Sequence, residues 1–404
     1  MPMQKVKNAG CRTFQFVFHY GALCLPWRKA VRVEGAGAIQ KIPGLLDREG
    51  AKHPMVVTDS GLMTAGVAPA VLQVLEDAAV PYALYDTVAP NPTIALVEEI
   101  FAAYQREGCD SFVAIGGGSS MDAAKAAAAR VARPGKSIRQ MSGLLRVGRK
   151  LPPFLAVPTT AGTGSETTIA ALITDEQNHH KAAMMDLHLI PKYAILDPLL
   201  TVGLPPHITA ATGMDALTHA IEAYLCWTYN TKESLRFAEE AVSIIFANLE
   251  RAYTDGKDVA ARMNMLTASY LAGFAFTRAG VGNVHAIAHT LGGLYNTPHG
   301  LANAVILPVV LEDYGPAVWP KLARLAELAG VQQDGSVEEK ANAFLQAIRD
   351  MNRRMGIPTG FDFIREEDIP QMVAWASAEA NPLYPVPVLF SPDRYRAVIE
   401  RIRI

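Results

Sequence analysis

The stretch FVAIGGGSSMDAAKAAAARVA, residues 112–132, joins a short apolar run to an alanine-rich run through three consecutive glycines. Phe112–Ile115 has the length and residue types of a buried strand, and the alanine run favours a helix. A glycine turn lets the backbone approach a ligand closely, and the free N–H groups at the start of a helix attract a phosphate. A tight turn without a ligand fits Gly116–Ser119 equally well, but Asp122 and Lys125 directly after it favour a binding site.

Short β-rich runs alternate with helical runs on both sides of this stretch. Strands are expected at residues 31–33, 55–57, 82–85, 112–115 and 154–157, with helices between them. Strands that alternate with helices of this length predict a parallel sheet that is covered on both faces. Residues 171–186 and 192–198 are expected to add strands near the edge of that sheet.

Two further groups of polar residues follow expected strands. The loop Pro158–Glu166 (PTTAGTGSE) suits either the capping of the next element or contacts to a nicotinamide ribose, a pyrophosphate or a substrate. Asp59 follows the strand at 55–57, where a carboxylate either caps a helix or accepts hydrogen bonds from an adenosine ribose. Because the carboxyl ends of parallel strands lie at one edge of a sheet, these groups are expected at its ligand-binding edge.

The character of the sequence changes after the Pro205–Pro206 pair. The runs that follow have helical periodicity and few β-rich stretches. We therefore expect a domain boundary near residue 205, with an α/β half at residues 1–204 and an all-helical half at residues 205–404. Two domains are also what a chain of 404 residues predicts.

Five residues of the helical half have the types and spacings of a metal site. Asp215 and His219 are four apart in GMDALTHAIEAY, His285 and His289 are four apart in VGNVHAIAHTLGG, and His299 follows in NTPHG. Residues four apart on a helix project from one face. A carboxylate with several imidazoles is a ligand set for Zn²⁺ or Fe²⁺. A single histidine is more often a hydrogen-bonded structural residue, but two such pairs with a further histidine favour a metal centre.

Composition narrows the kinds of partner and compartment. A formal net charge of −2 gives no electrostatic reason to expect nucleic acid or an anionic membrane as a partner. The four cysteines are widely spaced, so reduced thiols in the cytoplasm are expected. Residues 14–27 (FQFVFHYGALCLPW) are too short and too interrupted for a membrane span, and we expect an edge strand or a subunit contact there.

The motifs GGGSSMDAAK, PTTAGTGSE, GMDALTHAIEAY, GNVHAIAHTLGG and NTPHG follow one another in an order that resembles the iron-containing (group III) alcohol dehydrogenases. The resemblance extends from about residue 30 to about residue 360. It implies an α/β plus all-α protein with the dehydroquinate synthase-like fold. In that fold residues 1–204 are an N-terminal Rossmann-like dinucleotide-binding domain and residues 205–404 a C-terminal helical metal-binding domain.

The family pattern also implies roles for single residues. It makes Asp215, His219, His285 and His299 the metal ligands, and it places His289 near the nicotinamide and substrate without ligating the metal. The positions that match cofactor-contacting residues are Asp59, Asn91, Gly117, Gly118, Ser119, Thr159, Thr160, Thr163 and Lys181.

Two departures from the family pattern bear on the substrate. Arg278 is a cation where several members have a neutral polar residue, and it suits either a substrate carboxylate or polyol or an internal salt bridge. The C-terminal segment EANPLYPVPVLFSPD lacks the cysteine that known members carry near the equivalent Asn-Pro.

The implied activity is reversible hydride transfer between an alcohol and its aldehyde or ketone, with Fe²⁺ or Zn²⁺ and NAD as cofactors. NAD is expected because the Asp59 carboxylate would repel the ribose phosphate of NADP. The alternatives are a metal-dependent lyase of the dehydroquinate-synthase type, a hydroxyacid–oxoacid transhydrogenase, and a non-enzymatic nucleotide- or metal-binding relative. The expected partner is a small alcohol or carbonyl compound, with no nucleic acid or membrane. A cytoplasmic homo-oligomer is expected, with a dimer favoured.

Overall fold

The computed structural model describes residues 2–176 and 180–404, with the side chains of residues 2–5 and 180–182 outside the described part. The chain forms two compact units. The α/β unit contains Pro26–Leu204 and Gly256–Tyr270, and the helical unit contains the residues up to Leu25, Pro205–Asp255 and Leu271–Ile404.

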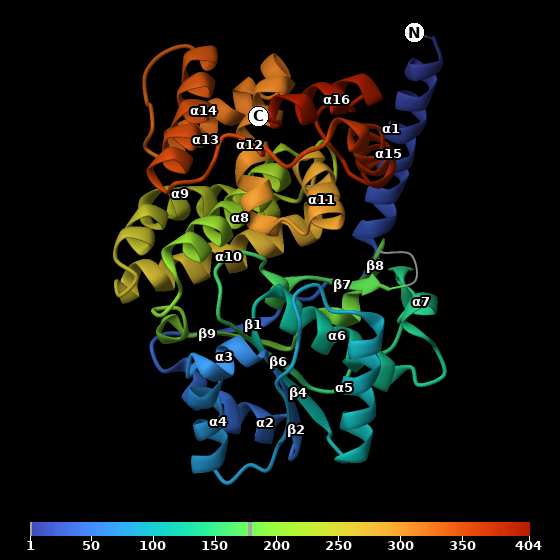
Figure 1. The fold of residues 1–404 in the computed structure, drawn as a ribbon, viewed down its shortest axis with the longest axis vertical. Helices are drawn as coiled ribbons and strands as arrows, with labels where there is room; N and C mark the ends of the chain where they lie inside the picture. Colours follow the sequence, from blue (N-terminus) through green and yellow to red (C-terminus); the bar gives the residue numbers. More distant parts are fainter. Residues whose placement is uncertain (1, 177–179) are drawn as a thin grey trace. The chain divides into compact units, whose positions relative to one another are not determined.

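The α/β unit alternates strands and helices along the chain (Figure 1). Its strands are β1 (Val31–Glu34), β2 (Pro54–Val57), β3 (Ala83–Tyr85), β4 (Ser111–Gly116), β5 (Gly143–Leu144), β6 (Phe154–Pro158), β7 (Ala170–Asp175), β8 (His180–Met185) and β9 (Tyr193–Leu196). Its helices are α2 (Ile42–Arg48), α3 (Ser60–Thr64), α4 (Val67–Asp77), α5 (Ile94–Arg106), α6 (Gly118–Ala132) and α7 (Ile138–Met141). Short 3-10 helices lie at Ala38–Lys41, Ser165–Thr167, Leu187–Leu189 and Pro198–Leu200.

In the described part of the chain, six strands form one sheet in the order β1-β9-β6-β4-β2-β3. Every pair in this sheet is parallel. The strands with entirely buried residues, β2, β4, β6 and β9, lie between the two partly exposed strands β1 and β3. The sequence correctly predicted a parallel sheet with alternating helices.

Successive residues of each strand contribute to different cores, because side chains of a strand point alternately to its two faces. On β4, Phe112 and Ala114 pack with α5 and α6, whereas Val113 and Ile115 pack with α2 and α4. The sheet is therefore covered by helices on both faces, as the continuous apolar strands predicted.

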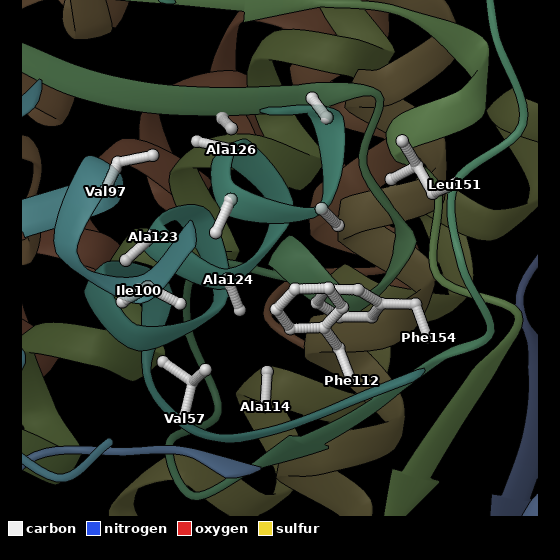
Figure 2. Packing of buried hydrophobic residues seen from close by; sticks show 14 of the residues in the cluster. Val57, Val97, Ile100, Phe112, Ala114, Ala123, Ala124, Ala126, Leu151 and Phe154 are labelled. Atoms are coloured by element: carbon white, nitrogen blue, oxygen red, sulfur yellow. The ribbon is translucent and has the colours of Figure 1, made fainter. Parts of the chain in front are cut away.

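Small residues let α6 approach the sheet closely. Ala126–Ala129 are fully buried in the helix that the alanine run predicted. Figure 2 shows Ala124 next to the ring of Phe112, which overlaps the ring of Phe154, and Ala123 next to Ile100. The two ring centroids are 6.0 Å apart. The small side chains of the alanine run thus let α6 pack against the sheet.

Two sequence-based expectations about local structure were wrong. β7 and β8 pair with each other and with β5 in a separate sheet, whereas β9 does lie near the edge of the main sheet, beside the edge strand β1. The helical run after β2 is divided into α3 and α4 at Gly66, whose φ of 75° lies in the left-handed region. Residues 14–23 are helical and belong to α1 (Pro2–Leu23), so the edge strand expected there does not exist.

The helical unit contains α1 and the helices after Pro205. These are α8 (Pro206–Leu225), α9 (Lys232–Thr254), the later part of α10 (Val259–Ala279), α11 (Asn283–Tyr295), α12 (His299–Tyr314), α13 (Trp319–Leu328), α14 (Val337–Arg354), α15 (Ile369–Ala380) and α16 (Pro392–Arg401). Short 3-10 helices lie at Gly315–Ala317 and Glu366–Asp368. Among the residues that the structure describes, no helix combines the length and apolar character needed to cross a membrane.

A buried lysine fastens the second polar loop to α6. Lys125 is fully buried, and its Nζ donates to Ser165 O (2.6 Å), Ser165 Oγ (2.9 Å) and Thr168 Oγ1 (2.9 Å). Asp122 accepts hydrogen bonds from Ser165 Oγ (2.8 Å) and Leu172 N (2.9 Å). Lys125 and Asp122 therefore hold the Pro158–Glu166 loop in place, so their hydrogen bonds account for both residues without a bound ligand.

Burial shifts the pKa values of both ionisable groups beside this loop. It lowers the pKa of Lys125 to about 8 and raises the pKa of Glu166 to about 7, although the two charges attract each other. Among the described residues, Glu166 Oε1 has no hydrogen-bond partner. The folded state therefore binds a proton at Glu166 more tightly than the unfolded state does.

This raised pKa predicts how Glu166→Gln changes the pH dependence of stability. The stabilisation due to protonated Glu166 is complete below the unfolded pKa of about 4.3 and is lost as the pH rises to about 7. Glutamine does not titrate, so the fall in unfolding free energy between pH 4.5 and 7 should shrink by roughly 1–3 kcal/mol. Chemical unfolding at several pH values measures it, with the exposed Glu240→Gln as control. An unchanged slope in Glu166→Gln would show that Glu166 is ionised in the folded protein.

Candidate metal centre

Three helices of the helical unit bring four potential metal ligands together. Asp215 and His219 lie one turn apart on α8, His285 lies on α11, and His299 is the first residue of α12. One ligand atom from each lies within 4.8 Å of the other three. Asp215, His219 and His285 are buried and His299 is half-buried. The structure thus brings together the four residues that the family pattern implied.

The close approach of α12 to α8 depends on a glycine. A Cβ atom at Gly300 would lie 2.3 Å from the carbonyl oxygen of Ala211, four residues before Asp215. Any side chain at this position would push the start of α12, including His299, away from α8. The glycine of NTPHG therefore permits the approach that puts His299 Nε2 3.5 Å from Asp215 Oδ1.

Glu222 on α8 fixes both the start of α11 and the ring of His285. Its carboxylate accepts hydrogen bonds from Gly282 N (2.8 Å), Val284 N (2.8 Å) and His285 Nδ1 (2.6 Å). A carboxylate is well placed at a helix N-terminus, where backbone N–H groups lack partners within the helix. Since Nδ1 of His285 donates to Glu222, its Nε2 keeps a lone pair for a metal.

Burial determines the charge states at this pair. It lowers the pKa of His285 well below the ordinary value, and the neighbouring imidazoles of His219 and His299 lower it further. It also raises the pKa of Glu222 to about 8, against the opposing effect of the backbone N–H groups of Gly282, Val284 and His285. A neutral imidazole is the form that ligates a metal.

Asn303 occupies the point on which the ligand atoms converge. Its Nδ2 lies 2.7 Å from Asp215 Oδ1, 3.2 Å from His285 Nε2 and 3.1 Å from His299 Nε2. The residue is fully buried. Among the described residues its Oδ1 has no hydrogen-bond partner. An amide NH₂ group has two hydrogens and here has three acceptor atoms around it, so these acceptors are grouped as they would be around a cation.

His289 lies beside this centre but outside the group of four. Its ring centroid is 5.2 Å from that of His299 and 6.0 Å from that of His285. Its Nδ1 is 2.5 Å from Glu379 Oε1, a carboxylate on α15. The paired Nδ1 leaves Nε2 as the ring nitrogen available to another group.

Three residues of this centre were missed by the sequence analysis. Glu222 lies three residues after His219 and Asn303 four residues after His299, so a search for polar residues one helical turn from each ligand would have found both. Glu379 gives no such signal, because it is 90 residues from His289 in the sequence.

The two loops expected to bind the cofactor face each other in the α/β unit. A Cβ atom at Gly117 would lie 3.3 Å from Thr160 Oγ1, and one at Gly118 would lie 3.0 Å from Thr163 Cγ2. Thr159 N donates to the carbonyl of Gly116 at 3.1 Å. Ser119 follows in the first turn of α6. These loops therefore form one structure at the carboxyl ends of β4 and β6.

The other positions implied to contact the cofactor are Asp59, Asn91 and Lys181, and they lie outside the two facing loops. Asp59 caps α3, with Oδ1 accepting from Leu62 N at 2.9 Å, while Oδ2 lies 3.5 Å from Ser120 Oγ. Asn91 is exposed and has a φ of 55°. Lys181 lies on β8 opposite Thr174, and its side chain is outside the described part.

The two departures from the family pattern lie in the helical unit. Arg278 is half-buried in the last turn of α10, and burial lowers the pKa of its guanidinium while the charge of Glu233 opposes that shift. The segment after α15 supplies no cysteine; it follows Glu379, the partner of His289.

A parallel α/β unit with paired polar loops, joined in one chain to a largely buried group of one Asp and three His, is typical of a class of metal- and dinucleotide-dependent oxidoreductases. Comparison with known proteins agrees. The sequence models of the iron-containing alcohol dehydrogenase family match residues 31–198, and those of the C-terminal part of the Fe-containing alcohol dehydrogenase family match residues 209–402.

Individual relatives cover most of the chain. Lactaldehyde reductase of Escherichia coli (strain K12) is 38% identical over 84% of this chain and 89% of its own length. NAD-dependent methanol dehydrogenase of Bacillus methanolicus is 39% identical over 83% of this chain and 89% of its own. The crystal structure of a 1,3-propanediol oxidoreductase has a TM-score of 0.90 and 36% identity, and the match covers 93% of this chain and 99% of that one.

The chain belongs to the iron-containing alcohol dehydrogenase family. It is an NAD-linked alcohol dehydrogenase, which transfers hydride reversibly between an alcohol and its aldehyde or ketone. The comparisons give no support to the lyase or transhydrogenase alternatives.

The contact between Glu222 and His285 predicts the effect of Glu222→Gln on metal affinity. Glutamine keeps the size of the side chain but cannot accept all three N–H groups as a carboxylate does, so the orientation of His285 is lost in part. Affinity for a divalent metal should fall about 10- to 100-fold. Metal content after dialysis against graded chelator measures this, and the exposed Glu240→Gln should retain wild-type affinity. Equal metal retention by the two variants would contradict the role given to Glu222.

Proposed function

We propose that this alcohol dehydrogenase works with one divalent metal ion held by Asp215, His219, His285 and His299. The observation that carries the proposal is the convergence of their ligand atoms within 4.8 Å, with three of the residues buried. One carboxylate and three imidazoles suit Fe²⁺ or Zn²⁺, and we favour Fe²⁺ because the chain belongs to the iron-containing family.

The residues present fit such an ion. Around the Asn303 Nδ2 atom, three acceptor atoms are grouped as they would be around a cation. When bound, a divalent metal lowers the pKa of an alcohol and polarises a carbonyl. The chain's own contribution is to hold the ligands: Glu222 keeps the Nε2 lone pair of His285 directed away from its carboxylate, and Gly300 lets α12 bring His299 to α8.

We further propose that the α/β unit is the dinucleotide-binding domain and that the helical unit is the metal-binding domain. The expected boundary near residue 205 is kept, but α1 belongs to the helical unit and Gly256–Tyr270 to the α/β unit, so the two domains are not simply residues 1–204 and 205–404. NAD would be held by the facing loops, through Gly117, Gly118, Ser119, Thr159, Thr160 and Thr163, with Asp59, Asn91 and Lys181 as further contacts. The support is the place of these loops at the carboxyl ends of parallel strands, together with the N–H groups at the start of α6.

The substrate we propose is a small alcohol or its aldehyde. The relatives named for lactaldehyde, methanol and 1,3-propanediol all act on compounds of this size. Arg278 remains a candidate contact for a carboxylate or polyol substrate. We also propose a cytoplasmic homodimer as the working form of the enzyme.

His289 is proposed as a catalytic residue that touches the substrate and is not a metal ligand. Glu379 holds its Nδ1 at 2.5 Å, so Nε2 can accept or return the proton of the substrate hydroxyl. The neighbouring rings of His285 and His299 place it beside the metal ligands.

Two alanine variants test the metal centre and the role of His289 together. His285→Ala removes a buried ligand and should abolish both stoichiometric metal and NADH production from a panel of small alcohols. His289→Ala should keep its metal and lose about 10²- to 10⁴-fold in turnover, because it removes only proton transfer. Metal analysis of anaerobically purified protein and NADH absorbance measure the two. Full metal occupancy in His285→Ala would refute the ligand set, and metal loss in His289→Ala would refute the division of roles.

The place of Asp59 predicts a preference for NAD over NADP. The phosphate of NADP carries between one and two negative charges, and SGLMTA after Asp59 contains no cation to offset repulsion by the carboxylate. Asp59→Asn can keep the cap on α3 while removing the charge. The ratio of kcat/KM for NAD to kcat/KM for NADP should be high in the wild type and fall about 10-fold or more in Asp59→Asn, mainly through better use of NADP. If Asp59 serves only as a helix cap, this variant leaves the ratio unchanged.

A further inference from the structure

The segment Pro382–Val388 (PLYPVPV), which follows α15, cannot supply hydrogen-bond donors for all of its own backbone carbonyl groups. Three of its seven residues are prolines, which have no N–H group, and the segment forms no helix or strand. Its carbonyl groups therefore depend on donors from elsewhere in the helical unit.

Each of the seven carbonyls of Pro382–Val388 has such a donor. The donors, in chain order of the carbonyls, are Gln15 Nε2 (3.0 Å), Tyr229 Oη (3.1 Å), Gln15 Nε2 (2.7 Å), Trp227 N (2.7 Å), Arg12 Nη1 (2.8 Å), Arg12 Nη2 (3.0 Å) and Asn283 Nδ2 (3.2 Å). Four of the seven come from Arg12 and Gln15 of α1. The conformation of this segment is therefore set largely by the N-terminal helix.

The side of α1 that faces this segment makes further contacts within the helical unit. Gln15 is fully buried, and Arg12 Nη1 also donates to Gln15 Oε1 at 2.9 Å. The guanidinium of Arg12 lies 4.8 Å from the ring centroid of Trp227, and Phe18 packs on Tyr229 at 5.2 Å. Trp227 and Tyr229, the two aromatic partners of α1, also donate hydrogen bonds to the segment, through Trp227 N and Tyr229 Oη. α1 precedes residue 31, where the match to the family begins.

The same segment reaches His289 through two side chains. Tyr384, whose carbonyl accepts from Gln15, donates its hydroxyl to Glu379 Oε1 at 2.6 Å. That oxygen also lies 2.5 Å from His289 Nδ1. Burial and the nearby Glu379 raise the pKa of Tyr384 well above its ordinary value, so its hydroxyl stays a donor.

We propose that α1 is an internal strap for the active-site histidine: Arg12 and Gln15 hold Pro382–Val388 so that Tyr384 keeps Glu379 on His289 Nδ1. Arg12, Gln15 and Tyr384 are then positioning residues. The strap keeps the proton of His289 on Nδ1 and leaves Nε2 for the substrate. The link to turnover rests on the proposed role of His289, whereas the link to its tautomer does not.

The first test reads the His289 ring directly, without activity. Ring ¹⁵N shifts of the zinc-loaded protein, assigned with His289→Ala, report which nitrogen carries the proton. Gln15→Ala and Tyr384→Phe should each shift His289 away from the pure Nδ1–H form. Val17→Ala, on the exposed side of α1, should leave it unchanged. Arg12→Ala serves if Gln15→Ala does not fold. An unchanged His289 ring in a folded, metal-loaded Gln15→Ala or Arg12→Ala variant would overturn the strap.

The second test measures turnover in the same variants. Gln15→Ala and Tyr384→Phe should each lower kcat at least 10-fold with unchanged metal content and unchanged KM for NAD. Because both act through one contact, the double variant should be no slower than the slower single variant. Multiplied effects in the double variant would mean that α1 acts by another route. If the ring shifts but kcat does not change in these variants or in His289→Ala, the strap stands and the catalytic role of His289 fails.

Discussion

The helical unit depends on one buried carboxylate. Glu222 accepts two backbone N–H groups at the start of α11 and the Nδ1–H of His285, so it fixes where this helix begins and how its imidazole is turned. A Cβ atom at Gly282 would lie 2.6 Å from Glu222 Oε1, so only glycine lets this carboxylate approach the helix. Without Glu222, the buried N–H groups of Gly282, Val284 and His285 would lose their hydrogen-bond acceptor. Leaving a buried donor without an acceptor costs more folding free energy than losing a contact at the surface.

A second close approach completes the centre. Gly300 lets α12 lie against α8 at Ala211, and this contact brings His299 and Asn303 to Asp215. The positions of the candidate ligands thus depend on helix packing. Gly300 lets α12 lie against α8, and the Glu222 carboxylate joins α8 to the start of α11. In the α/β unit, too, one buried charged side chain joins two elements: Lys125 ties α6 to the Pro158–Glu166 loop.

Functional groups of the helical unit are arranged in successive layers around His285 and His289. The four candidate metal ligands form the first, and Glu222 and Glu379 each hold the Nδ1 of one imidazole. Tyr384 and the segment Pro382–Val388 lie behind Glu379, and α1 holds that segment from the far end of the sequence. Residues from both ends of the chain therefore act on one imidazole.

The sequence by itself determined the parallel sheet with its helices and the family. Apolar strands, glycine loops and the spacing of four within the pairs Asp215/His219 and His285/His289 are local patterns, and local patterns can be read along a chain. The choice of Asp215, His219, His285 and His299 as candidate ligands, without His289, came from the resemblance to the family. Only the tertiary structure decided that β7 and β8 form their own sheet, that residues 14–23 are helical, and that Glu379 belongs to His289. Strand pairing and contacts between residues distant in sequence depend on which surfaces pack together, because no local periodicity encodes the partner.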